Sequence, residues 1–284
     1  MDIFMNMLLW SCDIQKKDFH TFEYVKNIGF DGVEFSLGSE QRKSYEDIGT
    51  FCDQIGLKRT AVCGAEPEVN AVSSDLNIRK ASKLWIRERI DDVVSAGASN
   101  LGGPFHSVFN HFTGTPVTDD EILYSVEFLQ EAGEYAAEQG VTLTPEFLNR
   151  YETYFGNTME QAKELLDRVN HPSVLGMYDT YHANIEEKSQ KEAIHTIAPY
   201  LSHVHISEND RGTPGKGQID FDLVFQTLQK IDFKGTIAIE AFNRQNQVFA
   251  DAVNVWRNYS PVEEILREGY DYTKSMVDQY LVSS

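Results

Sequence analysis

Four polar residues in the second half of the chain each stand at or near the end of a short apolar run. They are Glu146, Asp179, His205 and Glu240. Three carboxylates and one imidazole suit Mn, Mg or Co better than a structural zinc site, which prefers thiolates in a closed tetrahedron. A carboxylate after an apolar run also needs a partner, because burial of an unpaired charge is costly. The pattern therefore predicts one divalent metal ion held by these four side chains.

Two of the four residues have simpler explanations when each is taken alone. Asp179 suits the cap of a turn or helix. His205 shares one face of its expected strand with His203, and a strand histidine is often a hydrogen-bonded core residue rather than a ligand. The metal interpretation therefore depends on the four residues meeting in space, and so on the fold that carries them.

The elements that must position these residues alternate along the chain. Short apolar runs predict eight strands, at Phe4–Leu9, Gly32–Phe35, Lys58–Cys63, Asn100–Gly103, Val141–Pro145, Val174–Tyr178, His203–Ile206 and Thr236–Ile239. Amphipathic patterns predict helices between strands, among them Leu76–Ala96, Asp119–Gln139, Thr158–Val169, Glu186–Ala198 and Phe221–Ile231. Alternating strands and helices form a parallel sheet, and eight such units are typical of a closed barrel.

This order predicts a single α/β domain over residues 1–284, a (β/α)8 or TIM barrel. An open sheet with extra strands is the alternative, but no Gly-rich dinucleotide turn follows the first strand. Left-handed C-terminal caps are predicted before strands by Gly29, Gly56, Gly97, Gly140 and Gly235. Because active sites of such barrels lie at the C-terminal strand ends, the four candidate ligands would meet at one mouth.

Composition and charge disfavour several classes of protein. Hydrophobic residues make up 41% of the chain and charged residues 24%, as in ordinary globular proteins. The net charge of −19 disfavours nucleic acid and anionic membranes, whose binding depends on clustered Lys and Arg. Three cysteines without metal-ligand spacing suit a reducing compartment, and no basic residue precedes the first apolar run as in a leader. We therefore expect a cytoplasmic protein.

Four segments of the chain together resemble a known family. They are Thr144–Glu152, Tyr178–His182, His203–Gly217 and Ile239–Phe242. In these segments the chain resembles the xylose-isomerase-like barrel superfamily, and most closely its ketose 3-epimerases, the D-tagatose, D-allulose and L-ribulose group. The resemblance implies an isomerase, a carbohydrate epimerase that acts on a free keto-sugar. It also implies one divalent metal cofactor, Mn²⁺ first, with Mg²⁺ or Co²⁺ as alternatives.

By the same resemblance, the four candidate ligands hold the metal, and Glu146 and Glu240 are also the catalytic acid and base. Epimerisation of a ketose at C3 removes the proton beside a carbonyl and returns one to the other face, so two carboxylates on opposite faces are required. A metal that chelates the C2 carbonyl and C3 hydroxyl oxygens would stabilise the enediolate formed between these steps.

Further residues are implied to surround the substrate. The resemblance assigns contacts near the carbonyl end of the sugar to Glu152, His182 and Arg211, and the pocket lining to Cys63 and Phe242. The chain departs from several ketose epimerases in its first strand, where Met5, Asn6 and Met7 replace an aromatic residue that packs on the sugar. The preferred sugar therefore stays open.

Two segments have open roles. The loop Gly103–Phe112, rich in aromatic residues, is expected over the mouth as a lid, where His106 or His111 would touch substrate or be a bystander. The C-terminal run Val262–Leu281 would either close the barrel or face a partner, since barrels of this kind often form a homodimer or homotetramer.

Other reactions on the same scaffold are alternatives. A sugar or inosose isomerase, or a lyase of the C-glycoside deglycosidase type, also enolises beside a carbonyl and would use the same metal. An apurinic-site endonuclease is disfavoured, because it would need a His-rich multi-zinc cluster and a basic groove. A sugar-binding module without catalysis is disfavoured by the pair Glu146 and Glu240.

Overall fold

Eight parallel strands form a nearly closed barrel in the computed structural model, which describes residues 1–38 and 42–281. The strands are β1 (Ile3–Asn6), β2 (Gly32–Ser36), β3 (Lys58–Val62), β4 (Asn100–Gly103), β5 (Thr142–Pro145), β6 (Gly176–Asp179), β7 (Leu201–Ile206) and β8 (Thr236–Ile239). Their hydrogen-bonded order is β5-β4-β3-β2-β1-β8-β7-β6. Between β5 and β6, Leu143 N donates to Ser173 O and Leu143 O accepts from Leu175 N, both at 2.8 Å. The expected (β/α)8 barrel is thus confirmed.

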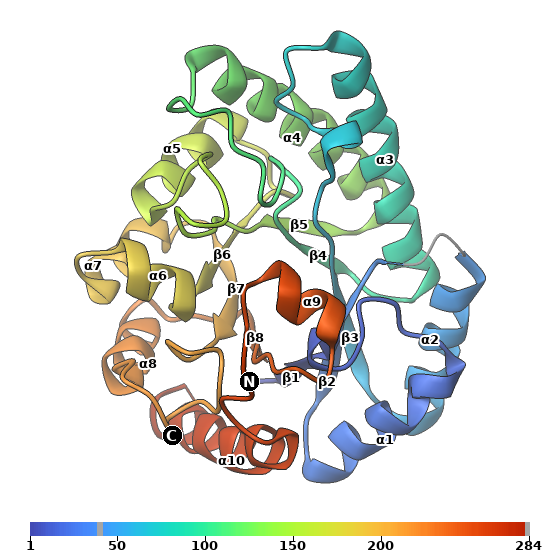
Figure 1. Ribbon diagram of the computed structural model, residues 1–284, viewed down its shortest axis with the longest axis vertical. Coiled ribbons are helices and arrows are strands. Elements are labelled where there is room, and N and C mark those ends of the chain that lie inside the picture. The colour runs from blue at the N-terminus through green and yellow to red at the C-terminus, as the bar shows by residue number, and fades with distance from the viewer. Residues whose placement is uncertain (39–41, 282–284) are drawn as a thin grey trace.

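Most helices lie around the barrel in the view of Figure 1. The helices are α1 (Phe19–Ile28), α2 (Arg42–Ile55), α3 (Leu76–Ser95), α4 (Asp119–Gln139), α5 (Met159–Val169), α6 (Thr180–Glu186), α7 (Gln190–Ile197), α8 (Phe221–Lys230), α9 (Gln247–Ala252) and α10 (Val262–Tyr280). Helix α9 lies over the strands in the same view. Three short 3-10 turns, Met7–Leu9, Lys16–Asp18 and Pro67–Val69, complete the described elements. Among the described residues, no helix is long and apolar enough to span a membrane.

Helix ends follow local chemistry that is visible in the sequence. Thr118 and Glu121 form a reciprocal capping box at the start of α4, and Thr158 and Gln161 form one at the start of α5. The predicted positive φ angles are present at Gly29, Gly56, Gly97 and Gly140. These stops return the chain to the next strand, so that each strand begins at the same end of the barrel.

The glycine prediction was wrong at Gly235. The left-handed residue after α8 is Asp232, with φ of 54°, and Gly235 has no positive φ. A Cβ added to Gly235 would lie 2.0 Å from the carbonyl oxygen of Ser202. Gly235 is therefore required by the close approach of β8 to β7, not by a helix cap.

Most predicted boundaries agree with the structure to within one or two residues, and two elements differ by more. The first strand ends at Asn6 instead of Leu9, because the Asn6 side chain accepts a hydrogen bond from Leu8 N at 2.9 Å and starts a 3-10 turn. The helix expected at Glu186–Ala198 is two helices: Glu186 ends α6, and Ser189 caps α7 by accepting from Glu192 N. Polar side chains that bond to nearby backbone groups interrupt both patterns.

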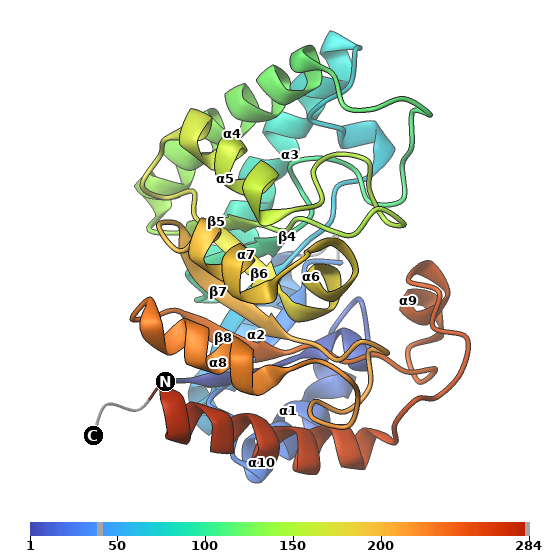
Figure 2. The ribbon, with the colours of Figure 1, turned by 90° about the vertical axis from the view of Figure 1, so that its left-hand side faces the viewer.

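The C-terminal run forms α10, which packs beside α1 and α8 and completes the helical ring. Ile265, Leu266 and Met276 of α10 are buried in the main hydrophobic core, and Tyr270 packs on Phe30 with ring centroids 4.6 Å apart. Of the two roles expected for this run, the structure therefore shows closure of the barrel. In Figure 2, the N-terminus and the C-terminal end of α10 lie at one end of the barrel. Helices α6 and α9 lie at the opposite end, which is the mouth of the barrel.

Candidate active site

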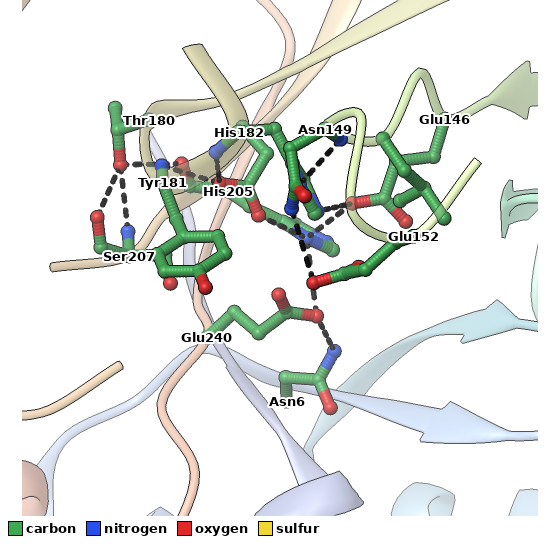
Figure 3. A network of polar contacts seen from close by, with 12 residues as sticks. Asn6, Glu146, Asn149, Glu152, Thr180, Tyr181, His182, His205, Ser207 and Glu240 are labelled. Atoms are coloured by element: carbon green, nitrogen blue, oxygen red, sulfur yellow. Dashed lines mark hydrogen bonds and ion pairs between the residues drawn. The ribbon is translucent and has the colours of Figure 1, made fainter. Parts of the chain in front are cut away.

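The four candidate ligands converge at the C-terminal mouth of the barrel, and all four are buried. Glu146 follows β5, Asp179 ends β6, His205 lies in β7 and Glu240 follows β8. Each offers one ligand atom, and these atoms lie within 4.8 Å of one another. Figure 3 shows Glu146 and Glu240 entering the site from different strand ends. The fold thus brings together the residues that the sequence pattern singled out.

Asp179 both caps a helix and faces the cluster. Its Oδ1 accepts from the backbone N–H groups of Tyr181 and His182, at 2.6 and 3.2 Å, at the start of α6. Its Oδ2 lies 3.6 Å from Nδ1 of His205. Capping therefore orients the carboxylate, so that its second oxygen faces the centre of the site.

His205 supplies the nitrogen at the centre of the cluster. Its Nδ1 lies 3.3 Å from Glu240 Oε1 and 3.8 Å from Glu146 Oε1, and makes no hydrogen bond within the part of the chain that the structure describes. Burial alone would lower the pKa of His205, but the negative charges of Glu34 and Glu240 and the contact with Asp179 hold this pKa well above its ordinary value. A buried nitrogen that faces three carboxylates at these distances fits a shared cation.

Repulsion between carboxylates is visible at Glu146. Burial raises the pKa of Glu146 well above its ordinary value, and the neighbouring charge of Glu240 raises it further. At Asp179, burial is outweighed by the nearby His182 and Arg211, which hold the pKa of this carboxyl well below its usual range. The cluster therefore holds more negative charge than its own imidazole can balance, and the donor set fits a divalent cation of the Mn, Mg or Co kind.

Arg211 supplies positive charge at the edge of the cluster. Its Nη1 donates to Glu240 Oε2 at 2.6 Å and to Asp179 Oδ2 at 3.3 Å. Its guanidinium lies over the ring of Tyr181 at 3.7 Å and near that of Phe242 at 4.9 Å. These contacts fix the planar group, so that it faces the mouth in one orientation.

The backbone of Arg211 is also unusual, with a left-handed φ of 61°. Two hydrogen bonds hold this conformation: Arg211 N donates to Glu208 O at 2.9 Å, and Arg211 O accepts from Phe242 N at 2.8 Å. A non-glycine residue in this region is sparsely populated and persists only where its surroundings hold it. The loop after β7 is therefore bonded to the end of β8 at this residue.

His182 lies between Asn149 and Arg211. The backbone N–H of Asn149 donates to Nδ1 of His182 at 3.1 Å, and Nη2 of Arg211 faces Nε2 at 3.2 Å. This Nε2 lies 3.6 Å from Glu146 Oε1. Burial lowers the pKa of His182, which favours the neutral ring. The side-chain nitrogen of Asn149 also donates to Glu152 at 3.0 Å (Figure 3). Asn149 therefore links His182 and Glu152, two of the predicted substrate contacts.

A cavity of about 280 Å³ opens above these residues. Its lining contains Glu146, Glu152, His182, Arg211, Glu240, Cys63 and Phe242, which include every residue predicted to contact the sugar. Leu8, Phe249 and Val253, which belong to one hydrophobic cluster, form an apolar part of its wall. A cavity of this size, lined by both polar and apolar groups, suits a small polar molecule such as a monosaccharide.

The loop Gly103–Phe112 contributes to the wall of this cavity through Gly103, Pro104 and Phe109. His106 is buried elsewhere, against the rings of Phe147 and Phe155 with centroids 4.6 and 5.5 Å away. Neither His106 nor His111 is among the residues that line the cavity. The structure therefore places neither of the two loop histidines in the pocket.

Several residues of the site were not singled out from the sequence. Besides Asn149 and Tyr181, they include Asn6 at the end of β1 and Glu34 within β2, both buried. Asn149 and Tyr181 lie inside motifs that carry the family resemblance, so the sequence contained a signal that placed them near the site. Glu34 was visible as a charged residue within a buried strand, which requires partners.

The fold and the site now allow comparison with known proteins. The family described as xylose isomerase-like TIM barrel matches residues 22–276. The chain therefore belongs to the xylose isomerase-like TIM barrel family.

Within this family, the chain is similar to several ketose 3-epimerases. The L-ribulose 3-epimerase of Methylomonas sp. (strain DH-1) is 30% identical, over 81% of this chain and 81% of its own. The D-psicose 3-epimerase of Agrobacterium fabrum is 28% identical, over 88% of each chain. A crystal structure of D-allulose 3-epimerase from Methylomonas sp. matches with a TM-score of 0.91 at 27% identity and covers 97% of this chain and 98% of that chain. These relatives confirm the expected resemblance to ketose 3-epimerases and the expected enzyme class, an isomerase of the carbohydrate epimerase kind.

Proposed function

We propose that this protein is a metal-dependent ketose 3-epimerase, which interconverts free keto-sugars by removal and return of the proton at C3. The observation that carries the proposal is the convergence of four buried ligand atoms within 4.8 Å beside a cavity of about 280 Å³. The relatives named ketose, psicose and ribulose 3-epimerases support the choice of reaction.

In this proposal Glu146, Asp179, His205 and Glu240 hold the metal, with Mn²⁺ preferred over Mg²⁺ or Co²⁺. When bound there, a divalent cation would act as a Lewis acid toward the C2 carbonyl and the C3 hydroxyl of the sugar. Oxygen-rich ligand sets favour cations of this kind over structural zinc.

Glu146 and Glu240 are the proposed acid and base. They follow β5 and β8, so they reach the cavity from different directions. One carboxylate removes the C3 proton on its face of the sugar, and the other carboxyl group returns a proton to the opposite face. Burial first, and then the charge of Glu240, raise the pKa of Glu146 above its ordinary value, which supports its assignment as the group that returns a proton.

Arg211, His182 and Glu152 are the proposed contacts for the carbonyl end of the sugar. Arg211 donates, Glu152 accepts and the imidazole of His182 carries one donor and one acceptor nitrogen when neutral, so the three can recognise a carbonyl and neighbouring hydroxyl groups. Their side chains are buried and held by Tyr181 and Asn149. This fixed arrangement would orient the substrate before proton transfer.

The apolar residues of the cavity wall have a separate proposed role. Leu8, Phe249 and Val253, together with Phe109 of the loop after β4, would exclude water from the bound sugar. Exclusion of water strengthens the electrostatic interactions that stabilise the enediolate.

The decisive experiment uses metal-depleted enzyme in deuterium oxide, with and without added Mn²⁺. The probes are D-fructose, D-tagatose, D-allulose and L-ribulose, and NMR follows deuterium at C3. We expect metal-dependent exchange at C3 together with formation of the C3 epimer. Absence of exchange with all four sugars would reject the proposal. It would favour a sugar or inosose isomerase, or a C-glycoside deglycosidase-type lyase, which acts beside a different carbonyl.

A further inference from the structure

Glu34 is a fully buried carboxylate in the barrel interior, on β2, and it has no part in the proposed proton transfer. His205 Nε2 lies 2.7 Å from its Oε1, and His203 Nε2 lies 2.9 Å from its Oε2. Asn6 Nδ2 donates to Oε1 at 3.0 Å, and Thr60 Oγ1 donates to Oε2 at 3.1 Å. Groups from three other strands, β1, β3 and β7, therefore surround one carboxylate of β2.

Both oxygens of this carboxylate have hydrogen bonds, as expected of an ionised group. Oε1 is bonded to Asn6 and His205, and Oε2 accepts from Thr60, while His203 Nε2 lies near Oε2 without a hydrogen bond. An ionised carboxylate accepts and does not donate, so His205 must carry a proton on Nε2. The lone pair of a neutral His205 is then on Nδ1, the atom that lies 3.3 Å from Glu240 and 3.6 Å from Asp179. Glu34 thus selects the tautomer in which a ligand nitrogen faces the candidate metal site.

Asn6 extends the same network to a second candidate ligand. Its Oδ1 accepts from Leu8 N at 2.9 Å, which fixes the amide so that Nδ2 is the donor. Nδ2 donates both to Glu34 Oε1, at 3.0 Å, and to Glu240 Oε1, at 3.1 Å. Figure 3 shows the contact between Asn6 and Glu240. One amide therefore sets the distance between Glu34 and a catalytic carboxylate.

We propose that Glu34 is a positioning residue for the candidate metal site. It fixes the tautomer and orientation of His205 directly and the carboxylate of Glu240 through Asn6. This inference rests on the proposed function only in taking these two residues as metal ligands. Partners that orient a metal-bound imidazole through its other nitrogen commonly change metal affinity by about 10- to 100-fold when replaced.

A second metal ion at Glu34, His203 and His205 is the rival explanation, since their ligand atoms also lie close together. The geometry disfavours it. The two imidazoles face different oxygens of Glu34, and Asn6 and Thr60 donate to the same two oxygens. An ion would have to replace these donors.

The test is the affinity of full-length protein for Mn²⁺, measured by electron paramagnetic resonance titration without any sugar. Glu34→Gln keeps the size of the side chain but places an NH2 group against one of the imidazoles. We expect its Kd for Mn²⁺ to rise by about 10- to 100-fold, with a changed spectrum of the bound ion. Thr60→Val is the matched control, because it removes one hydrogen bond from Glu34 on the side away from His205. We expect its Kd to stay within about threefold of wild type.

Each outcome decides between the possibilities. An unchanged Kd and spectrum in Glu34→Gln overturns the positioning role while the proposed epimerase stands, and a lower melting temperature alone then marks Glu34 as structural. Two Mn²⁺ ions per wild-type chain, reduced to one in Glu34→Gln, also overturn the proposal. Failure of wild type to bind Mn²⁺, Mg²⁺ or Co²⁺ rejects the metal site itself. If Glu34→Gln does not fold, Asn6→Ala replaces it, with weaker Mn²⁺ binding expected and unchanged binding overturning the inference.

Discussion

Nη1 of Arg211 lies 2.6 Å from Oε2 of Glu240, in a buried cluster that also contains Glu146 and Asp179. One guanidinium and the imidazole of His205 cannot balance three carboxylates, and the charge of Glu240 adds to burial in raising the pKa of Glu146. A divalent cation at this position would supply the missing positive charge. If the proposed metal binds here, the stability of the protein should depend on it.

We therefore expect metal-depleted protein to unfold at a lower temperature than protein with Mn²⁺. A ligand that binds only the folded state at about 100 times its Kd stabilises by about 2.7 kcal/mol. Thermal unfolding followed by circular dichroism, with Mn²⁺, Mg²⁺ or Co²⁺ added to metal-depleted protein, measures this effect. Asp179→Asn should lose most of the shift. Equal melting temperatures with and without each ion would contradict the metal site.

Replacement of Arg211 should affect sugar turnover more than metal affinity. Arg211→Met keeps much of the apolar contact with Tyr181 and Phe242 but removes the donors that face the pocket. Loss of a hydrogen bond from a charged group costs about 1.5–3 kcal/mol, so we expect kcat/KM to fall by roughly 10- to 100-fold. Steady-state epimerisation and a Mn²⁺ titration of the same variant check this. A Kd for Mn²⁺ that weakens as much as kcat/KM would count against a role in substrate binding.

Replacement of Glu146 or of Glu240 should affect C3 exchange differently for the two epimers of a substrate pair. If each serves one face of C3, Glu146→Gln and Glu240→Gln should each slow epimerisation by about 10²- to 10⁴-fold. Each should still catalyse exchange at C3 with the one epimer that its remaining carboxylate can deprotonate. NMR in deuterium oxide with saturating Mn²⁺, starting from each pure epimer, measures this.

A pocket glutamate outside the cluster provides the control. Glu66 also lines the cavity but is exposed, and Glu66→Gln should keep near wild-type exchange with both epimers. If the Glu146 and Glu240 variants bind Mn²⁺ and lose exchange equally from both epimers, the assignment of one carboxylate to each face is wrong.

The parts of the site that the sequence predicted share one physical origin. In a parallel barrel the C-terminal strand ends meet at one mouth, so Asp179 and Glu240 could be brought together from strand order alone. Capping and glycine rules predicted most helix ends, because these rules act within a few residues. The roles of Asp179 and Glu240 in metal binding and catalysis remain predictions.

The parts that were missed depend on contacts across the barrel interior. Glu34 on β2 meets His205 on β7, although 171 positions separate them. That meeting depends on the stagger of strands around the closed ring, which local periodicity does not specify. Asn6 was noticed only as a departure from an aromatic residue, and its hydrogen bonds to Glu34 and Glu240 emerge from the register of β1 between β2 and β8.

His106 leads to a prediction about stability and pH. Burial lowers its pKa to about 3, and neither ring nitrogen has a hydrogen-bond partner within residues 1–38 and 42–281. The unfolded chain binds a proton at His106 below about pH 6.5, whereas the folded chain does not until near pH 3. Stability is therefore present above pH 6.5 and is lost as the pH falls toward 3. Between pH 7 and pH 5 the loss from this residue should be about 2 kcal/mol.

His106→Phe tests this account, because a phenyl ring can pack on Phe147 and Phe155 and cannot take up a proton. The free energy of unfolding, from urea titrations at pH 7 and pH 5, should fall by about 2 kcal/mol less in the variant than in wild type. His20→Phe, at an exposed position, should leave the wild-type pH dependence unchanged. If His106→Phe and wild type lose the same free energy between pH 7 and pH 5, His106 is protonated in the folded protein. Its ring would then have a polar partner, and its burial against the two phenylalanines would have to be reinterpreted.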